Sequence, residues 1–249
     1  MIEPVEARRL DRGDGTMLAY RRRDGAVPTF VFLPGYASDM DGAKAQALDQ
    51  FAAERGIGML RFDYAGTGLS EGKFKDGTIE NWLGDALAVI DAQSGGPLIL
   101  IGSSMGGWIA LHIALARPDR VKGILTIAAA PDFTEWGYTE VEKAEIVEKG
   151  ELVQPNLSGG DPWVTPRAFW ESGQRLRVLD GPIAIDCPVR LVQGDSDVEV
   201  PAEIASRLLG ALRSADVQLT IVKGGGHRLS EPREIALILR TAAGLLETP

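Results

Sequence analysis

The chain has little cysteine, little histidine and no long apolar stretch. It contains one cysteine, Cys187, and a single thiol excludes both a disulfide within the chain and a cysteine-based zinc cluster. No segment reaches the roughly 20 apolar residues that a membrane-spanning helix needs. Residues 1–6 lack the basic and apolar regions of a secretory signal. These absences predict a soluble, cytoplasmic protein with no membrane span and no metal.

Positive charge is also scarce. Lys and Arg number 26 against 35 Asp and Glu, so the net charge is −9. The one short basic run, Arg21-Arg22-Arg23, ends a predicted strand. Binding to nucleic acid or to a polyanion requires a basic surface, and both classes of partner are therefore disfavoured.

Strand and helix patterns alternate along most of the chain. This alternation predicts an α/β fold with a mostly parallel sheet and helices on both faces. A turn at 12–15 predicts an antiparallel hairpin at the N-terminus. The predicted strands are 5–10, 17–22, 29–33, 57–62, 98–102, 123–128, 189–193 and 217–222, and the predicted helices are 42–55, 79–93, 105–116, 202–212 and 232–246.

The alternation lapses between Pro131 and Pro188. This interval holds two helix patterns, at 139–149 and 165–174, and three of the five tryptophans of the chain. An insertion of this length between two core strands is typical of a cap over the carboxyl edge of the sheet, where open α/β sheets bind ligands. We therefore expect a core formed by 1–130 and 189–249, with a small helical cap formed by 131–188.

The pattern G-x-S-x-G occurs twice, around Ser104 and around Ser70. Ser104 stands directly between a predicted strand and a predicted helix, where a sharp turn exposes the hydroxyl of a nucleophile. Ser70 follows a loop and is followed by a polar stretch, so we interpret it as a loop serine. Ser104 is the candidate nucleophile.

A serine nucleophile needs a base, and the chain has two histidines. His112 lies in the helix behind Ser104, and eight helical residues carry it about 12 Å away along the axis. His227 lies in the loop that follows the predicted strand 217–222. His227 is the candidate base, and His112 is expected to be a helix residue.

The third member should be a carboxylate at the end of a later strand. Asp195, Asp197 and Glu199 all follow strand 189–193, and Asp132 follows strand 123–128. Asp195 lies beside a glycine and suits a turn. Asp132 is the rival of the acids in the 195–199 segment. The order Ser104, Asp197, His227 is the chain order Ser, acid, His that this architecture uses.

Hydrolysis through a tetrahedral intermediate also needs hydrogen-bond donors for an oxyanion. The backbone N–H of Met105, directly after the nucleophile, is one candidate. The backbone N–H of Tyr36, in the loop after strand 29–33, is the other.

Together these residues resemble the α/β-hydrolase superfamily, and within it serine hydrolases of the palmitoyl-protein thioesterase and acyl-glucuronide esterase type. The resemblance implies the α/β-hydrolase fold and a triad of Ser104, Asp197 and His227. The matching segments are 32–36, 42–45, 61–68, 102–108, 116–118, 187–191, 194–201 and 227–228.

The leading hypothesis is a cofactor-free serine hydrolase of carboxylic esters or thioesters. The aromatic cap favours an apolar acyl group, on a small-molecule or S-acylated substrate. One alternative keeps the triad and cleaves an amide or a C–C bond. Another is a non-catalytic ligand-binding protein on the same fold.

Overall fold

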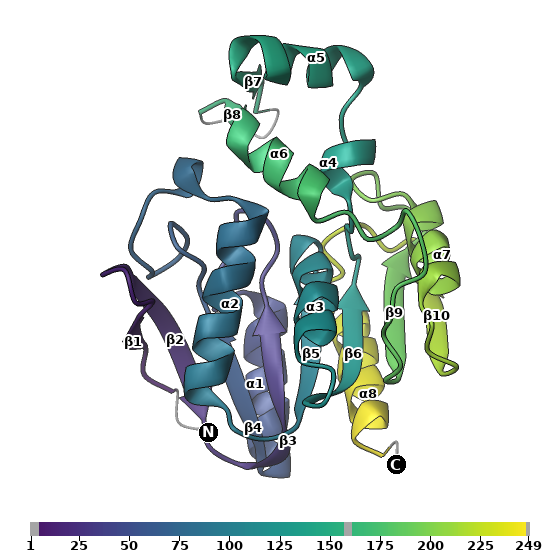
Figure 1. The fold of residues 1–249 in the computed structure, drawn as a ribbon. Coiled ribbons are helices and arrows are strands. Elements are labelled where there is room, and N and C mark those ends of the chain that lie inside the picture. Colours follow the sequence, from purple (N-terminus) through teal and green to yellow (C-terminus); the bar gives the residue numbers. More distant parts are fainter. Residues whose placement is uncertain (1–4, 157–160, 248–249) are drawn as a thin grey trace.

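An eight-stranded sheet forms the centre of the molecule, and the computed structural model describes residues 5–156 and 161–247. The strands lie in the order β1-β2-β4-β3-β5-β6-β9-β10 (Figure 1). Their bounds are β1 Arg8–Asp11, β2 Met17–Arg23, β3 Ala26–Leu33, β4 Ile57–Phe62, β5 Leu98–Ser103, β6 Val121–Ile127, β9 Val189–Gly194 and β10 Val217–Val222. The helices of the core are α1 Ala43–Arg55, α2 Ile79–Gln93, α3 Met105–Ala116, α7 Ala202–Ala211 and α8 Pro232–Leu246, with a short 3-10 helix, η1, at Phe74–Asp76.

The sheet is parallel except at one edge. β2 runs antiparallel to both β1 and β4, whereas every pair from β4 to β10 is parallel. Helices α2 and α3 cover one face, and α1 and α8 cover the other (Figure 1). The predicted α/β fold, with a mostly parallel sheet and an antiparallel hairpin at the N-terminus, is confirmed.

Alternate side chains of each central strand pack on opposite faces of the sheet. Leu98 and Leu100 belong to the apolar cluster that includes side chains of α2 and α3, while Ile99 and Ile101 belong to the cluster that includes side chains of α1 and α8. Because helices bury both faces, these strands read as continuous apolar runs in the sequence. This burial makes the carboxyl edge of the sheet a rigid support for the loops that follow the strands.

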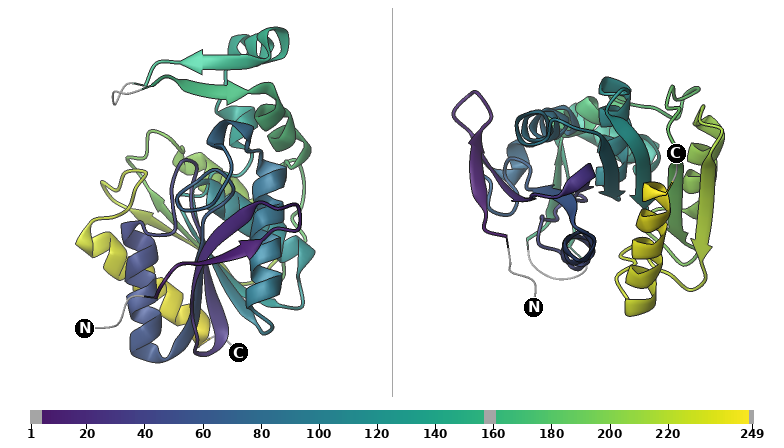
Figure 2. Two further views of the ribbon diagram at one scale, coloured as in Figure 1. Left: turned by 90° about the vertical axis from the view of Figure 1, so that its left-hand side faces the viewer. Right: turned by 90° about the horizontal axis from the view of Figure 1, so that it is seen from below.

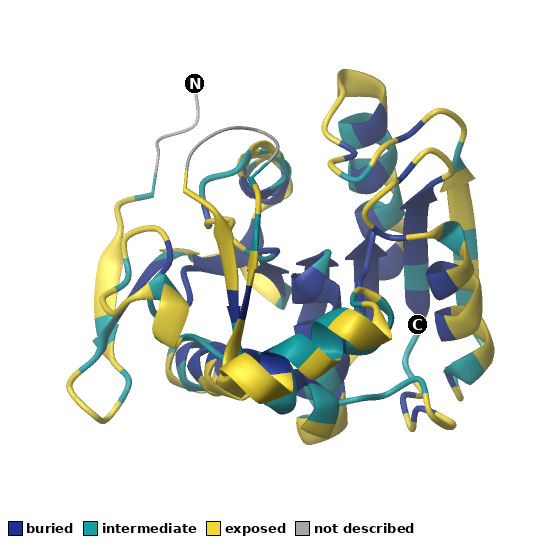
Figure 3. Ribbon diagram, turned by 90° about the horizontal axis from the view of Figure 1, so that it is seen from above, coloured by how far each residue is buried: buried dark blue, intermediate teal, exposed yellow. Residues whose placement is uncertain are grey.

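The segment between β6 and β9 lies above that carboxyl edge (Figures 1 and 2). Its described residues, 128–156 and 161–188, contain three helices and a two-stranded antiparallel sheet. The bounds are α4 Phe133–Trp136, α5 Glu140–Lys149, β7 Glu151–Gln154, β8 Trp163–Pro166 and α6 Arg167–Arg175. Viewed from above, much of the central sheet is buried and much of the cap is exposed (Figure 3). Val153 and Val164 of the hairpin are among the exposed apolar residues.

The two predicted helices of this segment are present, but the β7–β8 hairpin was not predicted. Thr139 accepts a hydrogen bond from the N–H of Glu142 and caps α5, so that helix begins at Glu140. The predicted helix at 165–174 is wrong in its first two residues, because Thr165 and Pro166 pair with β7. The cap is therefore mixed, and the division into core and cap at residues 131 and 188 stays a prediction.

Three strand predictions need correction where the strands begin. The first strand begins at Arg8 instead of residue 5, β3 begins at Ala26 instead of residue 29, and β6 begins at Val121 instead of residue 123. Cys187 precedes β9, and burial raises the pKa of its thiol to about 11. Over the ranges 5–156 and 161–247, the structure has no helix long and apolar enough to cross a bilayer, and no group of three or more potential metal ligands.

Candidate active site

Ser104 occupies a strained turn between β5 and α3. Its φ of 53° and ψ of −122° lie in a region that residues with a side chain rarely adopt. Backbone hydrogen bonds hold it there: its N–H donates to the carbonyl of Ile127 at 2.9 Å, and its carbonyl accepts from Ala130 at 3.1 Å. The neighbouring strand β6 and the loop after it therefore support the conformation that presents the Ser104 hydroxyl.

The glycines around Ser104 allow strand and helix to approach closely. A Cβ on Gly106 would lie 2.0 Å from the carbonyl oxygen of Leu33, and one on Gly102 would lie 2.3 Å from the carbonyl oxygen of Gly106. A Cβ on Gly107 would lie 2.6 Å from the Cβ of Ala129. No side chain fits at these three positions without movement of the backbone or of Ala129.

Ser104, His227 and Asp197 form a chain of hydrogen bonds. The Ser104 Oγ lies 3.0 Å from His227 Nε2, and His227 Nδ1 lies 2.9 Å from Asp197 Oδ2. Because a carboxylate only accepts, Nδ1 carries the proton and Nε2 presents a lone pair to the serine hydroxyl. The structure thus brings together the three residues that the sequence predicted as a triad, from three loops at one edge of the sheet.

Asp197 is held in a fully buried position. Its Oδ1 accepts the backbone N–H groups of Glu199 and Val200, each at 2.9 Å, and its side chain has no exposed surface. Its Oδ2 accepts from His227 and from the side-chain amide of Gln193 at 3.0 Å. Four donors therefore saturate this carboxylate, which fixes its orientation towards the imidazole.

The loops that carry Asp197 and His227 are joined directly. The N–H of Ser196 donates to the carbonyl of Gly225 at 3.0 Å. A Cβ on Gly194 would lie 2.2 Å from that same carbonyl oxygen. Glycine at the end of β9 therefore permits the contact that sets the distance between acid and base.

The second G-x-S-x-G pattern is structural. Ser70 donates to the carbonyl of Asp63 at 2.7 Å and accepts from the N–H of Ala19 at 2.8 Å. Its hydroxyl is thus engaged with two backbone groups in the loop after β4. This agrees with the interpretation of Ser70 as a loop serine.

The other candidate acids accept hydrogen bonds from backbone N–H groups or from a surface lysine. Asp195 accepts from Lys223 and from the N–H of Gly224, and the Lys223 ammonium lowers the pKa of the Asp195 carboxyl. Asp132 accepts the N–H groups of Val178 at 2.8 Å and Leu179 at 2.7 Å, and burial raises its pKa. Asp132 therefore anchors the return of the cap to the core, a role the sequence did not indicate.

Glu199 lies at the edge of the site. Its side chain is 65% exposed, and its Oε2 is 3.7 Å from His227 Nε2, longer than a hydrogen bond. Its carboxylate faces the same His227 nitrogen that contacts Ser104. Because Glu199 is exposed, solvent weakens the electrostatic interaction between its carboxylate and the imidazole.

His112 is separated from this chain of hydrogen bonds. Its Nε2 lies 2.8 Å from the carbonyl oxygen of Leu176, which also accepts the indole N–H of Trp108 at 3.1 Å. Burial lowers the pKa of His112, since it disfavours the charged imidazolium. His112 thus ties α3 to the end of the cap as a neutral donor.

A pH-dependent loss of stability is expected from His112. Its pKa is about 6.5 in an unfolded chain and lower in the folded protein, so the unfolded state binds more protons as the pH falls below about 6.5. The free energy of unfolding should therefore decrease as the pH is lowered. The contribution of His112 to this decrease is at most about 1.4 kcal/mol per pH unit. Urea denaturation of wild type and His112→Leu at several pH values checks this: the variant should lose that part of the slope. Parallel curves would contradict it.

The loop after β3 lies against the nucleophile. A Cβ on Gly35 would be 3.3 Å from the Cβ of Ser104, which places Tyr36 next to the site. Within residues 5–156 and 161–247, the backbone N–H groups of Tyr36 and Met105 donate to no other protein atom. Both predicted oxyanion donors are thus free to bind a substrate oxygen.

The ring of Tyr36 is the centre of an aromatic cluster that joins core and cap. Its centroid lies 4.9 Å from that of Phe74, 5.3 Å from that of Phe169 and 6.2 Å from that of Trp163. Burial raises the pKa of the Tyr36 phenol well above its usual range. The sequence drew attention only to the backbone of Tyr36, because ring contacts between segments this far apart leave no local pattern. The other rings around it are Trp82 and Phe133.

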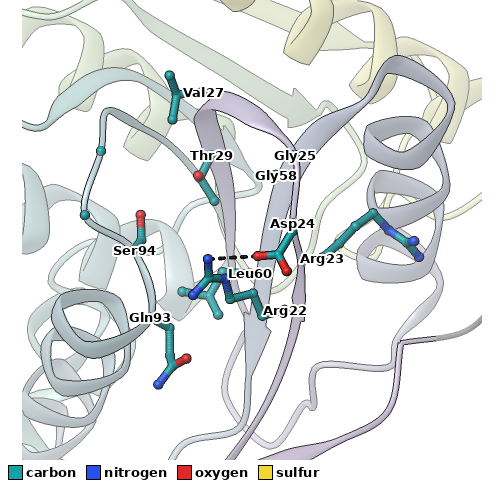
Figure 4. Close-up of a pocket in the computed structure, with 12 residues that line it drawn as sticks. Arg22, Arg23, Asp24, Gly25, Val27, Thr29, Gly58, Leu60, Gln93 and Ser94 are labelled. Carbon is teal, nitrogen blue, oxygen red and sulfur yellow. Dashed lines mark ion pairs between the residues drawn. The ribbon is translucent and has the colours of Figure 1, made fainter.

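A shallow depression of about 170 Å³ lies at the opposite edge of the sheet (Figure 4). It is lined by residues at the amino ends of β3 and β5, among them Thr29 and Ser94, and by the Arg22–Asp24 ion pair at 2.8 Å. Ser104, Asp197 and His227 follow the carboxyl ends of their strands. The depression is therefore not part of the candidate active site.

Known proteins match this chain over most of its length. A family model described as serine aminopeptidase, S33, matches residues 26–158. The mitochondrial palmitoyl-protein thioesterase ABHD10 of Mus musculus is 37% identical over 242 residues, which cover 96% of this chain and 82% of that protein. A putative hydrolase from Agrobacterium vitis has a TM-score of 0.90 at 39% identity, covering 98% of this chain and 99% of that one. Alpha/beta hydrolase domain-containing protein 10 from mouse has a TM-score of 0.91 at 35% identity, covering 97% and 98%.

Proposed function

This chain belongs to the serine aminopeptidase S33 family of hydrolases, and we propose that it is a serine hydrolase that cleaves carboxylic esters or thioesters of apolar acyl groups. The observation that carries the proposal is the chain of hydrogen bonds from Ser104 through His227 to Asp197. It lies at the end of a strained turn and beside two free backbone donors.

In the proposed reaction, Ser104 Oγ attacks the acyl carbonyl while His227 Nε2 takes its proton. The N–H groups of Tyr36 and Met105 bind the oxyanion of the tetrahedral intermediate. His227 then protonates the leaving group, and an acyl-enzyme remains on Ser104. Water, activated by His227, hydrolyses this ester, and Asp197 stabilises the imidazolium in both steps.

The aromatic cluster supports an apolar acyl group. Tyr36 carries both a proposed oxyanion donor and the ring at the centre of the cluster, so a bound acyl chain would begin beside apolar surface. Relatives named palmitoyl-protein thioesterases support an S-acylated or small-molecule acyl substrate. An acyl-glucuronide esterase activity is a second form of the same proposal. A cytoplasmic location stays a prediction from the sequence, and the thioesterase relatives are named as mitochondrial.

A chain-length series tests the substrate class. For acyl thioesters from two to sixteen carbons, kcat/KM should rise with length, by up to about fourfold per buried methylene. Trp163→Ala should flatten this rise, because Trp163 contacts Tyr36 and is already 44% exposed, so its loss should not unfold the protein. Val164→Ala is the matched control, since its side chain leaves the opposite face of the same strand.

Acyl glucuronides and aminoacyl amides of equal acyl size complete the panel. A preference for aminoacyl amides would replace the esterase proposal with amide hydrolysis by the same triad. A length-independent kcat/KM would remove the apolar acyl site from the proposal.

A further inference from the structure

Gln193 is a buried amide at the end of β9, four residues before Asp197. It is 1% exposed, and the residues before it in the strand, Leu191 and Val192, are buried and apolar. A polar side chain in such a strand is unfavourable unless its hydrogen bonds are made. Its partners therefore indicate why it is there.

Among the described residues, the side-chain NH2 group of Gln193 contacts hydrogen-bond acceptors only. Its Nε2 lies 3.0 Å from Asp197 Oδ2 and 3.0 Å from the carbonyl oxygen of Val200, with the carbonyl oxygen of Gly194 at 3.3 Å. The reverse orientation of the amide would bring its oxygen against these oxygens, so the NH2 group must point towards Asp197. The Oε1 atom has no partner among the described residues.

The two N–H groups of Gln193 bind two points of the loop that carries the acid, residues 195–200, which we call the acid loop. One reaches Asp197, and the other reaches Val200, whose own N–H donates to Asp197 Oδ1 at 2.9 Å. The oxygen that receives the Gln193 N–H is the same Oδ2 that receives His227 Nδ1–H. A change in this contact therefore acts on the atom that orients the imidazole.

We propose that Gln193 is a positioning residue for the triad: it fixes the Asp197 carboxylate, and through it the angle at which His227 meets Ser104. The proposal rests on the proposed function. It explains why an unpaired Oε1 is tolerated, since both N–H groups must face the acid loop. Among the described residues, Gln193 makes no hydrogen bond to Ser104 or His227 and acts on them only through Asp197.

Two variants of similar size test the role. Gln193→Met removes the donor and should lower kcat about 10- to 100-fold with KM unchanged, since misplacing a catalytic group costs on this scale. Gln193→Glu at neutral pH should lower kcat further, because two carboxylates about 3 Å apart repel each other. Gln218→Met, an exposed residue on β10, is the control and should leave kcat unchanged.

A double-mutant comparison separates positioning from general stability. In an Asp197→Ala background, Gln193→Met should have no further effect on kcat, because Gln193 acts only through that carboxylate. Equal kcat losses for Gln193→Met in both backgrounds would overturn the proposal, as would wild-type kcat in both Gln193 variants. If Gln193→Met does not fold, the polar and equally large Gln193→Glu variant carries the test. Activity in Ser104→Ala would instead overturn the proposed function itself.

Discussion

Ser104→Ala is expected to lower kcat for an aryl ester by at least about 10⁴-fold, because it removes the only atom that can form the acyl-enzyme in the proposed mechanism. The folded structure should survive, since alanine keeps the backbone that strand β6 supports through the Ser104 N–H and carbonyl. Steady-state kinetics and intact mass after reaction with a fluorophosphonate measure the effect. Wild type should gain one adduct, and the variant none.

Ser70→Ala is the matched control, since it alters the same pentapeptide pattern at its second occurrence. Its hydroxyl bonds to the carbonyl of Asp63 and the N–H of Ala19, so its loss should reduce stability and leave kcat nearly unchanged. An adduct on the Ser104→Ala variant, or loss of labelling in Ser70→Ala alone, would move the nucleophile away from Ser104.

Asp197→Asn should lower kcat by about 10⁴-fold while the protein remains folded. An asparagine amide cannot accept from His227 Nδ1 and from the three other donors in the same way as a carboxylate. The imidazole would then lose the partner that keeps its proton on Nδ1, and Nε2 would no longer present a lone pair to Ser104. The rate of acylation, measured as the burst with an aryl ester, reports this loss directly.

Asp132→Asn distinguishes this acid from its rival. Asp132 accepts the backbone N–H groups of Val178 and Leu179, so its substitution should lower the free energy of unfolding, by roughly 1–3 kcal/mol, and leave the burst intact. A burst lost in Asp132→Asn and kept in Asp197→Asn would reverse the assignment.

The elements of the core were predictable from the sequence because their signals are local. Continuous apolar runs such as Leu98–Ser103 are typical of strands covered on both faces. Helix α2 occupies the predicted range 79–93, and the Thr78 side chain caps it by accepting the N–H of Asn81. The Ser104 elbow was predictable for the same reason, since strand, turn and helix are adjacent in the chain. The choice between Ser104 and Ser70 followed from those neighbours alone.

The β7–β8 hairpin could not be predicted in this way. Each strand has four residues, and the pairing of Gln154 with Trp163 joins them across a long connection. Strands this short carry little periodicity. Leu152 and Thr165 on the hairpin are buried, and the Thr165 hydroxyl lies 3.0 Å from that of Tyr138, a contact that the sequence pattern does not indicate. The ring contacts of Tyr36 could not be predicted either, because they join segments far apart in the chain. The partners of Gln193 lie within seven residues of it, but a single glutamine in an apolar strand has no pattern that predicts its contacts.

The sequence by itself determined the fold class, the nucleophile candidate and the histidine most able to serve it, because each depends on the order of elements and on what lies next to a residue. Only the tertiary structure shows which hydrogen bonds each acid makes. Asp132, Asp195 and Asp197 all follow strands, and Asp197 was named from the sequence only through the resemblance. What separates them is which donors reach each carboxylate, and those donors come from segments up to 47 residues away. Contact at that range is set by the packing of the whole sheet and cap.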